Sequence, residues 1–181
     1  MKDRKINQEK SPQKPEVWLR GPVKGIPNLL QPVAHALLQA GEDMHRYADE
    51  FPKELLWLKP AGRASVGFHL QHLTGVLDRM LTYARKKNLS DLQFEQLKEE
   101  GVENSNSSTI QLMQDFDSKV SEAMEYFKTV EVDTFTEDRF VGRKKMPSTH
   151  LGLLFHAAEH SQRHIGQMLV TISILKHKES L

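Results

Sequence analysis

The chain has 181 residues, 38% apolar and 27% charged, which is enough for one domain with a sizeable core. Its 25 basic and 24 acidic residues nearly balance, so charge gives no reason to expect nucleic acid or an anionic membrane as a partner. The absence of cysteine excludes disulfides, thiolate metal sites and a cysteine nucleophile, and it fits a cytoplasmic protein.

The N-terminal segment, residues 1–15, is polar, rich in lysine and contains proline, without the apolar core of a signal peptide. No run in the chain approaches the roughly 18–20 apolar residues that a membrane-spanning helix needs. We therefore expect a flexible arm over residues 1–15 and one domain over residues 16–181.

Apolar residues recur at helical spacing over four segments: 28–51, 65–87, 109–129 and 148–176. Pro52 ends the first, Ser65 is a suitable N-cap for the second, and Ile110 opens the apolar stripe of the third. Pro147 and Ser148 mark the start of the fourth. Four amphipathic helices of this length predict an all-α fold, a four-helix bundle.

Two connections between these helices have features of their own. Residues 88–108 form a link longer than most helix–helix loops, which indicates function or contact elsewhere, and a short helical turn is expected from Leu89 to Leu92. Residues 135–147 alternate apolar and polar side chains around Gly142, which predicts a small hairpin or an extended loop.

The most informative pattern is a pair of histidines on the fourth helix. His160 and His164 are four residues apart, so they are neighbours on one helix face, and the apolar stripe places that face toward the core. Two buried histidines bonded to neighbouring helices would need several polar partners there. A metal ion is the simpler partner, because neutral imidazole is a common ligand of zinc, nickel and iron.

A third ligand should come from another helix, and His69 and His72 share a face of the second. Helical spacing alone barely separates the two. On the fourth helix, His156 and His164 differ by about 80° around the axis, so one ion would not take both, and His156 either lines the pocket or simply packs. The other histidines have no clear partner and are interpreted as surface or interface residues: His35, His45, His150 and His177.

Several other functional classes are excluded by their motifs. The zinc-protease pattern His-Glu-x-x-His does not occur, since Glu159 precedes His160. A di-iron site needs Glu-x-x-His on two helices, and this pattern occurs once, ending at His45. Neither a phosphate-binding glycine loop with lysine nor a serine nucleophile elbow is present.

The segments 65–73, with His69 and His72, and 153–167, which ends in His164-Ile165-Gly166-Gln167, together resemble the DinB-like superfamily. The resemblance extends over residues 18–176. It implies a DinB-like four-helix bundle, often a homodimer, with a divalent ion such as zinc or nickel. It also implies His72, rather than His69, as the ligand beside His160 and His164.

What the resemblance implies about activity is less specific, because members include thiol transferases, isomerases and proteins without a known reaction. One hypothesis is a metal-dependent thiol S-transferase of the bacillithiol type, or a hydrolase, acting on a small-molecule substrate such as a low-molecular-weight thiol. The alternative is a non-catalytic, stress-related metal-binding or interaction protein.

Further residues could serve such a pocket. His156 and Gln167 are candidate pocket groups, and Gly166 would let a neighbouring group approach the helix closely. Four basic residues precede the fourth helix and either hold a carboxylate-bearing thiol or form a solvated turn: Arg139, Arg143, Lys144 and Lys145.

Overall fold

The computed structural model describes residues 14–179. The expected N-terminal arm, residues 1–15, therefore lies outside the described residues except for Lys14 and Pro15. The helices are α1 (Gln31–Ala48), α2 (Val66–Ala84), α3 (Asp91–Glu99), α4 (Thr109–Lys128) and α5 (His150–Glu179), and the strands are β1 (Asp138–Val141) and β2 (Met146–Thr149). The predicted helical fold is confirmed, with a small two-stranded sheet added to it.

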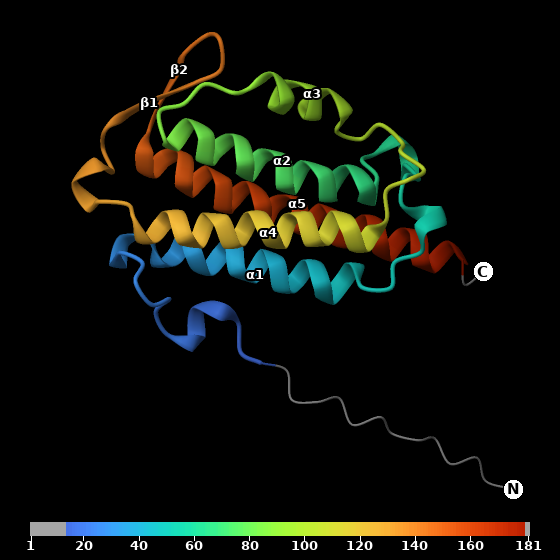
Figure 1. Cartoon of the computed structure of the whole chain (residues 1–181). Coiled ribbons are helices and arrows are strands. Elements are labelled where there is room, and N and C mark those ends of the chain that lie inside the picture. The colour runs from blue at the N-terminus through green and yellow to red at the C-terminus, as the bar shows by residue number, and fades with distance from the viewer. Residues whose placement is uncertain (1–13, 180–181) are drawn as a thin grey trace, which may run out of the picture.

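Four long helices, α1, α2, α4 and α5, run side by side (Figure 1). α5 packs against α1 and α2, and α4 packs against the same two helices. The side chains between them form one continuous apolar core, whose fully buried members include Leu37, Leu77, Phe116, Leu154 and Met168.

Helix boundaries follow the expected capping residues in part. The Ser65 hydroxyl oxygen accepts a hydrogen bond from the Phe68 backbone N–H at 3.1 Å, which caps α2 as predicted. Pro147 and Ser148 belong to β2, so α5 begins slightly later, at His150. Ile110 was wrongly included in the core stripe of α4, since its side chain is exposed in the first turn of that helix.

The link between α2 and α4 contains more structure than expected. Its helical part extends over nine residues as α3, and Ser90, the N-cap before it, forms a capping box with Gln93. No residue of α3 is buried, and it lies against α2 on the outside of the long helices (Figure 1). The link ends at Ser108, which caps α4.

The predicted hairpin before the last helix is present as β1 and β2, paired antiparallel from Asp138 opposite Thr149 to Val141 opposite Met146. Gly142 makes its turn with a positive φ of 69°.

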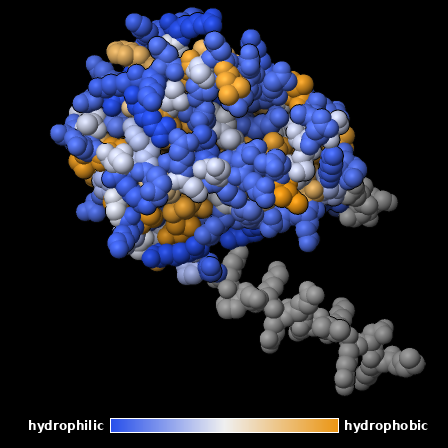
Figure 2. All heavy atoms as spheres, in the orientation of Figure 1, coloured by the Kyte–Doolittle hydropathy of each residue, from blue (hydrophilic) through white to orange (hydrophobic). Residues whose placement is uncertain are grey.

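Among the described residues, no helix combines the length and apolar character needed to cross a membrane. The face shown in Figure 2 is mostly hydrophilic, with apolar side chains in small separate groups.

Candidate metal centre

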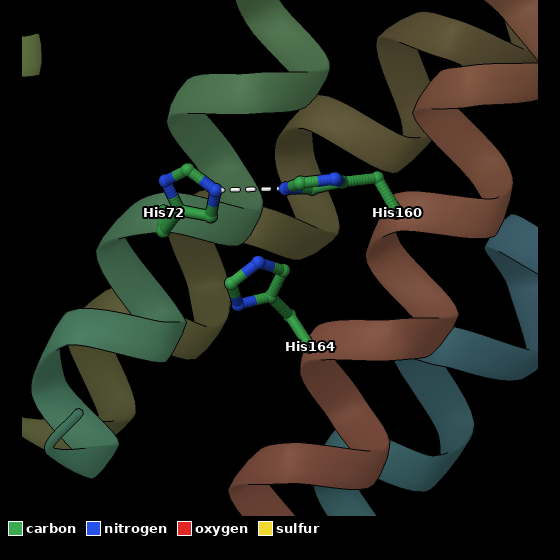
Figure 3. A group of neighbouring side chains, drawn as sticks. All are labelled: His72, His160 and His164. Atoms are coloured by element: carbon green, nitrogen blue, oxygen red, sulfur yellow. Dashed lines mark hydrogen bonds between the residues drawn. The ribbon is translucent and has the colours of Figure 1, made fainter. Parts of the chain in front are cut away.

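Three histidine rings from two helices point toward one another (Figure 3). His72 comes from α2, and His160 and His164 come from α5. Nε2 of His72 lies 2.9 Å from Nε2 of His160, and the His164 ring centroid lies 4.4 Å and 4.5 Å from those of His72 and His160. One nitrogen from each ring lies within 4.8 Å of the other two, which is a suitable arrangement for holding one ion.

The way α5 packs leaves the rings of His160 and His164 partly accessible to solvent. The buried positions on this stretch of α5 are Ala157, Ala158, Ser161 and Ile165. His160 and His164 lie on the side facing α2, where they contact His72 and His69. Both rings point toward α2, as their face of α5 predicts, and both are partly exposed at the edge of the core. The cluster therefore has one side toward packed helices and one toward solvent.

Burial keeps His160 and His164 uncharged at neutral pH. Loss of water, followed by the nearby His72, lowers the pKa of His160 to about 4 and that of His164 to about 3. Both rings therefore carry a free nitrogen lone pair at pH 7, the form of imidazole that binds metals.

Glu100, just after α3, fixes the orientation of His72. Its Oε2 lies 2.6 Å from Nδ1 of His72, and its Oε1 accepts a hydrogen bond from Nη1 of Arg79 at 2.6 Å. The three side chains are largely buried, with exposures of 7% for Glu100, 9% for Arg79 and 17% for His72. Because a carboxylate only accepts, Nδ1 of His72 is the donor in this contact, and its Nε2 is the atom that faces His160.

Two glycines make room for this arrangement. A side chain at Gly75 would place its Cβ 2.2 Å from Oε1 of Glu100 and 2.6 Å from Nη1 of Arg79. Gly101, at a φ of 81°, lies against the ring of Phe68 and donates its backbone N–H to the Gln71 side chain at 2.8 Å. The segment carrying Glu100 is thus tied closely to α2.

His69 has a different place from His72. It is 2% exposed, and its Nδ1 lies 3.0 Å from Nδ1 of His164. Burial, with a smaller effect of His72, lowers the pKa of His69 to about 4. His69 thus contacts His164 from the buried side and can hold the His164 ring in place.

One ring nitrogen of His160 has no hydrogen-bond partner among the described residues. Nδ1 of His160 is the one buried side-chain nitrogen or oxygen among the described side chains, residues 14–177, that has no hydrogen-bond partner. If Nδ1 carries the proton and His72 is neutral, two Nε2 lone pairs face each other at 2.9 Å across His72 and His160. If Nε2 carries it, Nδ1 is an acceptor without a donor. A cation between the Nε2 atoms would relieve the first arrangement, and nitrogens of a tetrahedral zinc site are about 3.3 Å apart.

Other candidate residues have different surroundings. Nδ1 of His156 lies 2.8 Å from a carboxylate oxygen of Glu159, and these two side chains form a second possible ligand group with His160. Gln167 is exposed, one turn beyond His164. The expectation that Gly166 allows a close neighbour was wrong, because a Cβ there would meet nothing within 4 Å.

The basic residues before α5 are not brought to the histidines. Arg139 is buried and donates from Nε to the Ala84 carbonyl at 2.7 Å, in the last turn of α2. Ala84 lies twelve residues after His72, about 18 Å further along the same helix. The hypothesis that these residues hold a thiol at the metal is therefore not supported by their placement.

Of the histidines interpreted as surface or interface residues, His150 is instead buried inside the protein. It is 4% exposed, and its ring nitrogens lie 2.8 Å from the Tyr126 hydroxyl and 2.9 Å from that of Thr134. His35 and His45 are half-buried, and His177 is exposed.

Comparison with known proteins gives one family. The family model described as the DinB superfamily matches residues 36–168, a range that includes all three clustered histidines as well as Glu100 and Arg79. A search of curated proteins finds no match.

Proposed function

Because this chain belongs to the DinB superfamily, we propose that His72, His160 and His164 bind one divalent metal ion. The observation that carries the proposal is the convergence of these imidazoles from two helices, with one nitrogen of each within 4.8 Å of the others. The low pKa values of His160 and His164 support it, since no proton need leave those rings at neutral pH. Zinc or nickel suits such a nitrogen donor set best.

The chain's own contribution would be to hold three ligands and leave further coordination positions open. Glu100 orients His72, His69 supports His164, and the partly exposed rings leave one side of the ion accessible from solvent. When bound, such an ion lowers the pKa of a coordinated water or thiol and so supplies a nucleophile at neutral pH. Without cysteine, the protein would take any thiolate from a small molecule.

We extend this proposal to a metal-dependent reaction, either thiol S-transfer or hydrolysis, within a cytoplasmic four-helix protein that pairs as a homodimer. The partly exposed side of the histidine group supports the reaction, because a substrate could reach the ion there. One observation favours the alternative, a non-catalytic metal-binding role: the basic residues expected to hold an anionic thiol lie at the far end of α2, with Arg139 on Ala84.

The metal proposal is tested by elemental analysis of purified protein after incubation with zinc or nickel and removal of the excess. We expect near-stoichiometric metal in the wild type and little in His160→Ala. His177→Ala is the matched control, because it removes an exposed histidine from the same helix. A wild type that takes up neither ion would overturn the proposal.

The second possible ligand group makes the experiment sharper. His156→Ala removes a ring that belongs to that group but not to the group of His72, His160 and His164. Retention of metal in His156→Ala supports binding by His72, His160 and His164. Loss of metal in this variant would instead indicate binding by His156, Glu159 and His160. Conjugation assays with metal-loaded protein and small thiols then separate the catalytic from the non-catalytic alternative.

A further inference from the structure

A cavity lies at the other end of α2, away from the histidines. This cavity, of about 730 Å³, opens between the last turn of α2, helix α3 and the β1–β2 hairpin. In Figure 1 the hairpin and α3 both lie on the outer side of α2. This volume is within the range of about 300–1,000 Å³ that is typical of small-molecule sites.

The rim of the cavity carries unpaired positive charge. Lys87, Arg143 and Lys145 line it, and each is exposed. Within the part of the chain that the structure describes, none of the three forms an ion pair. Lys86 also lines the cavity but is paired with Glu137 at 2.9 Å. The rim therefore attracts an anion, although the chain as a whole is nearly neutral.

A buried guanidinium lies deeper in the same cavity. Arg139 is 4% exposed and is held by its Nε bond to the Ala84 carbonyl and by Nη1, which donates to Glu137 at 3.1 Å and to the Asp138 carbonyl at 3.0 Å. Among the described side chains, residues 14–177, the hydrogen bonds of Arg139 involve Nε and Nη1, and its other terminal nitrogen, Nη2, has no partner. A rigidly held arginine with a free nitrogen is well suited to recognise a carboxylate or phosphate.

The remaining wall is apolar and aromatic. Tyr83 from α2, Phe94 from α3 and Phe140 from β1 all line the cavity. The guanidinium carbon of Arg143 lies 5.2 Å from the centroid of the Phe94 ring, so basic and aromatic groups meet in one place. Phe140 is 52% exposed, which leaves apolar surface available for contact.

We propose that this cavity binds a small amphipathic anion, with an aromatic or acyl body against Tyr83, Phe94 and Phe140 and an acidic group toward Arg139 and the basic rim. Both halves of the ligand follow from the walls: an inorganic anion would leave the aromatic side uncovered, and a neutral apolar molecule would leave the positive charges unmatched. The site is separate from the histidines, so it does not depend on the metal proposal.

The test uses 8-anilinonaphthalene-1-sulfonate, a fluorescent aromatic anion, with the full chain. We expect saturable binding at one site and displacement by decanoate but not by decanol, which has the same chain without charge. Lys87→Glu/Lys145→Glu reverses two exposed charges of the rim and should weaken binding about tenfold, since each lost contact is that of an exposed ion pair. Lys59→Glu/Arg63→Glu is the matched control, because both residues are exposed and lie outside the cavity.

Each result decides the proposal. Weaker binding in the rim variant with unchanged binding in the control supports it, whereas equal binding in both variants overturns it. Equal displacement by decanol and decanoate would also overturn it, because charge would then play no part. Sedimentation with phosphatidylglycerol vesicles but not with phosphatidylcholine vesicles, together with no binding of free decanoate, would assign the basic rim to a membrane surface instead.

Discussion

Replacement of Glu100 by glutamine tests how the histidine centre is built. The carboxylate accepts from His72 and Arg79, each at 2.6 Å. A glutamine side chain keeps one oxygen and turns the other position into an NH₂ group, which would face a donor. One of the two contacts is then lost and the other becomes an ordinary neutral–charged bond.

The magnitude follows from the burial of the group. A hydrogen bond to a charged partner contributes about 1.5–3 kcal/mol, and leaving one member of a buried ion pair unmatched costs about 3–5 kcal/mol. Because Glu100 and Arg79 are both more than nine-tenths buried, we expect the metal-free variant to lose about 3–5 kcal/mol of unfolding free energy. Metal affinity should fall about 10–100-fold, because His72 loses the group that orients it.

Two measurements separate these effects: urea unfolding with chelator present, and zinc titration against a chromophoric chelator. The neighbouring Glu99→Gln is the matched control, since Glu99 is exposed and lies one residue earlier. In Arg79→Met/Glu100→Gln the unmatched cation is gone, so stability should recover in part while zinc affinity stays low. Unchanged zinc affinity in Glu100→Gln would refute the orienting role, even if the protein were less stable.

Two further predictions concern a buried histidine and a pair of glycines. Burial lowers the pKa of His150, which lies beside Tyr126. The unfolded state therefore binds the extra proton, and stability falls as the pH drops below about 6.5. His150→Gln should lose less unfolding free energy than the wild type between pH 7 and pH 5, and identical losses would contradict this. Gly75→Ala should displace Glu100 and weaken zinc binding, because the added Cβ would meet its carboxylate. Gly166→Ala, with open space around it, should gain roughly 1 kcal/mol of unfolding free energy in urea. Equal zinc affinities in the two variants would exclude a packing role for Gly75.

Sequence periodicity predicted the elements that carry the histidines but not the finer geometry. The i, i+4 spacing of His160 and His164 follows from helix geometry alone, so their proximity could be predicted. His69 and His72 are on the same face of α2, and only the packing of α5 decides which ring meets His160 and which meets His164. That these rings bind metal stays a prediction.

Glu100 could not be predicted because it lies in a segment without helical or strand periodicity. The length of that connection was the one available signal, since it indicated contact elsewhere, but it did not identify the residue. His150 was placed on the surface for a similar reason: its partners, Tyr126 and Thr134, precede it in the chain by 24 and 16 residues and carry no local pattern.

The histidine contacts also join parts of the chain that are far apart in sequence. His72 and His160 are separated by 88 residues, and His69 and His164 by 95. Contacts of this range close large loops and tend to form late in folding. Because the ligands lie on α2 and α5, a cation could join all three only after these two helices have docked against each other. Metal would then act as a lock on the finished fold, slowing unfolding while leaving the folding rate almost unchanged.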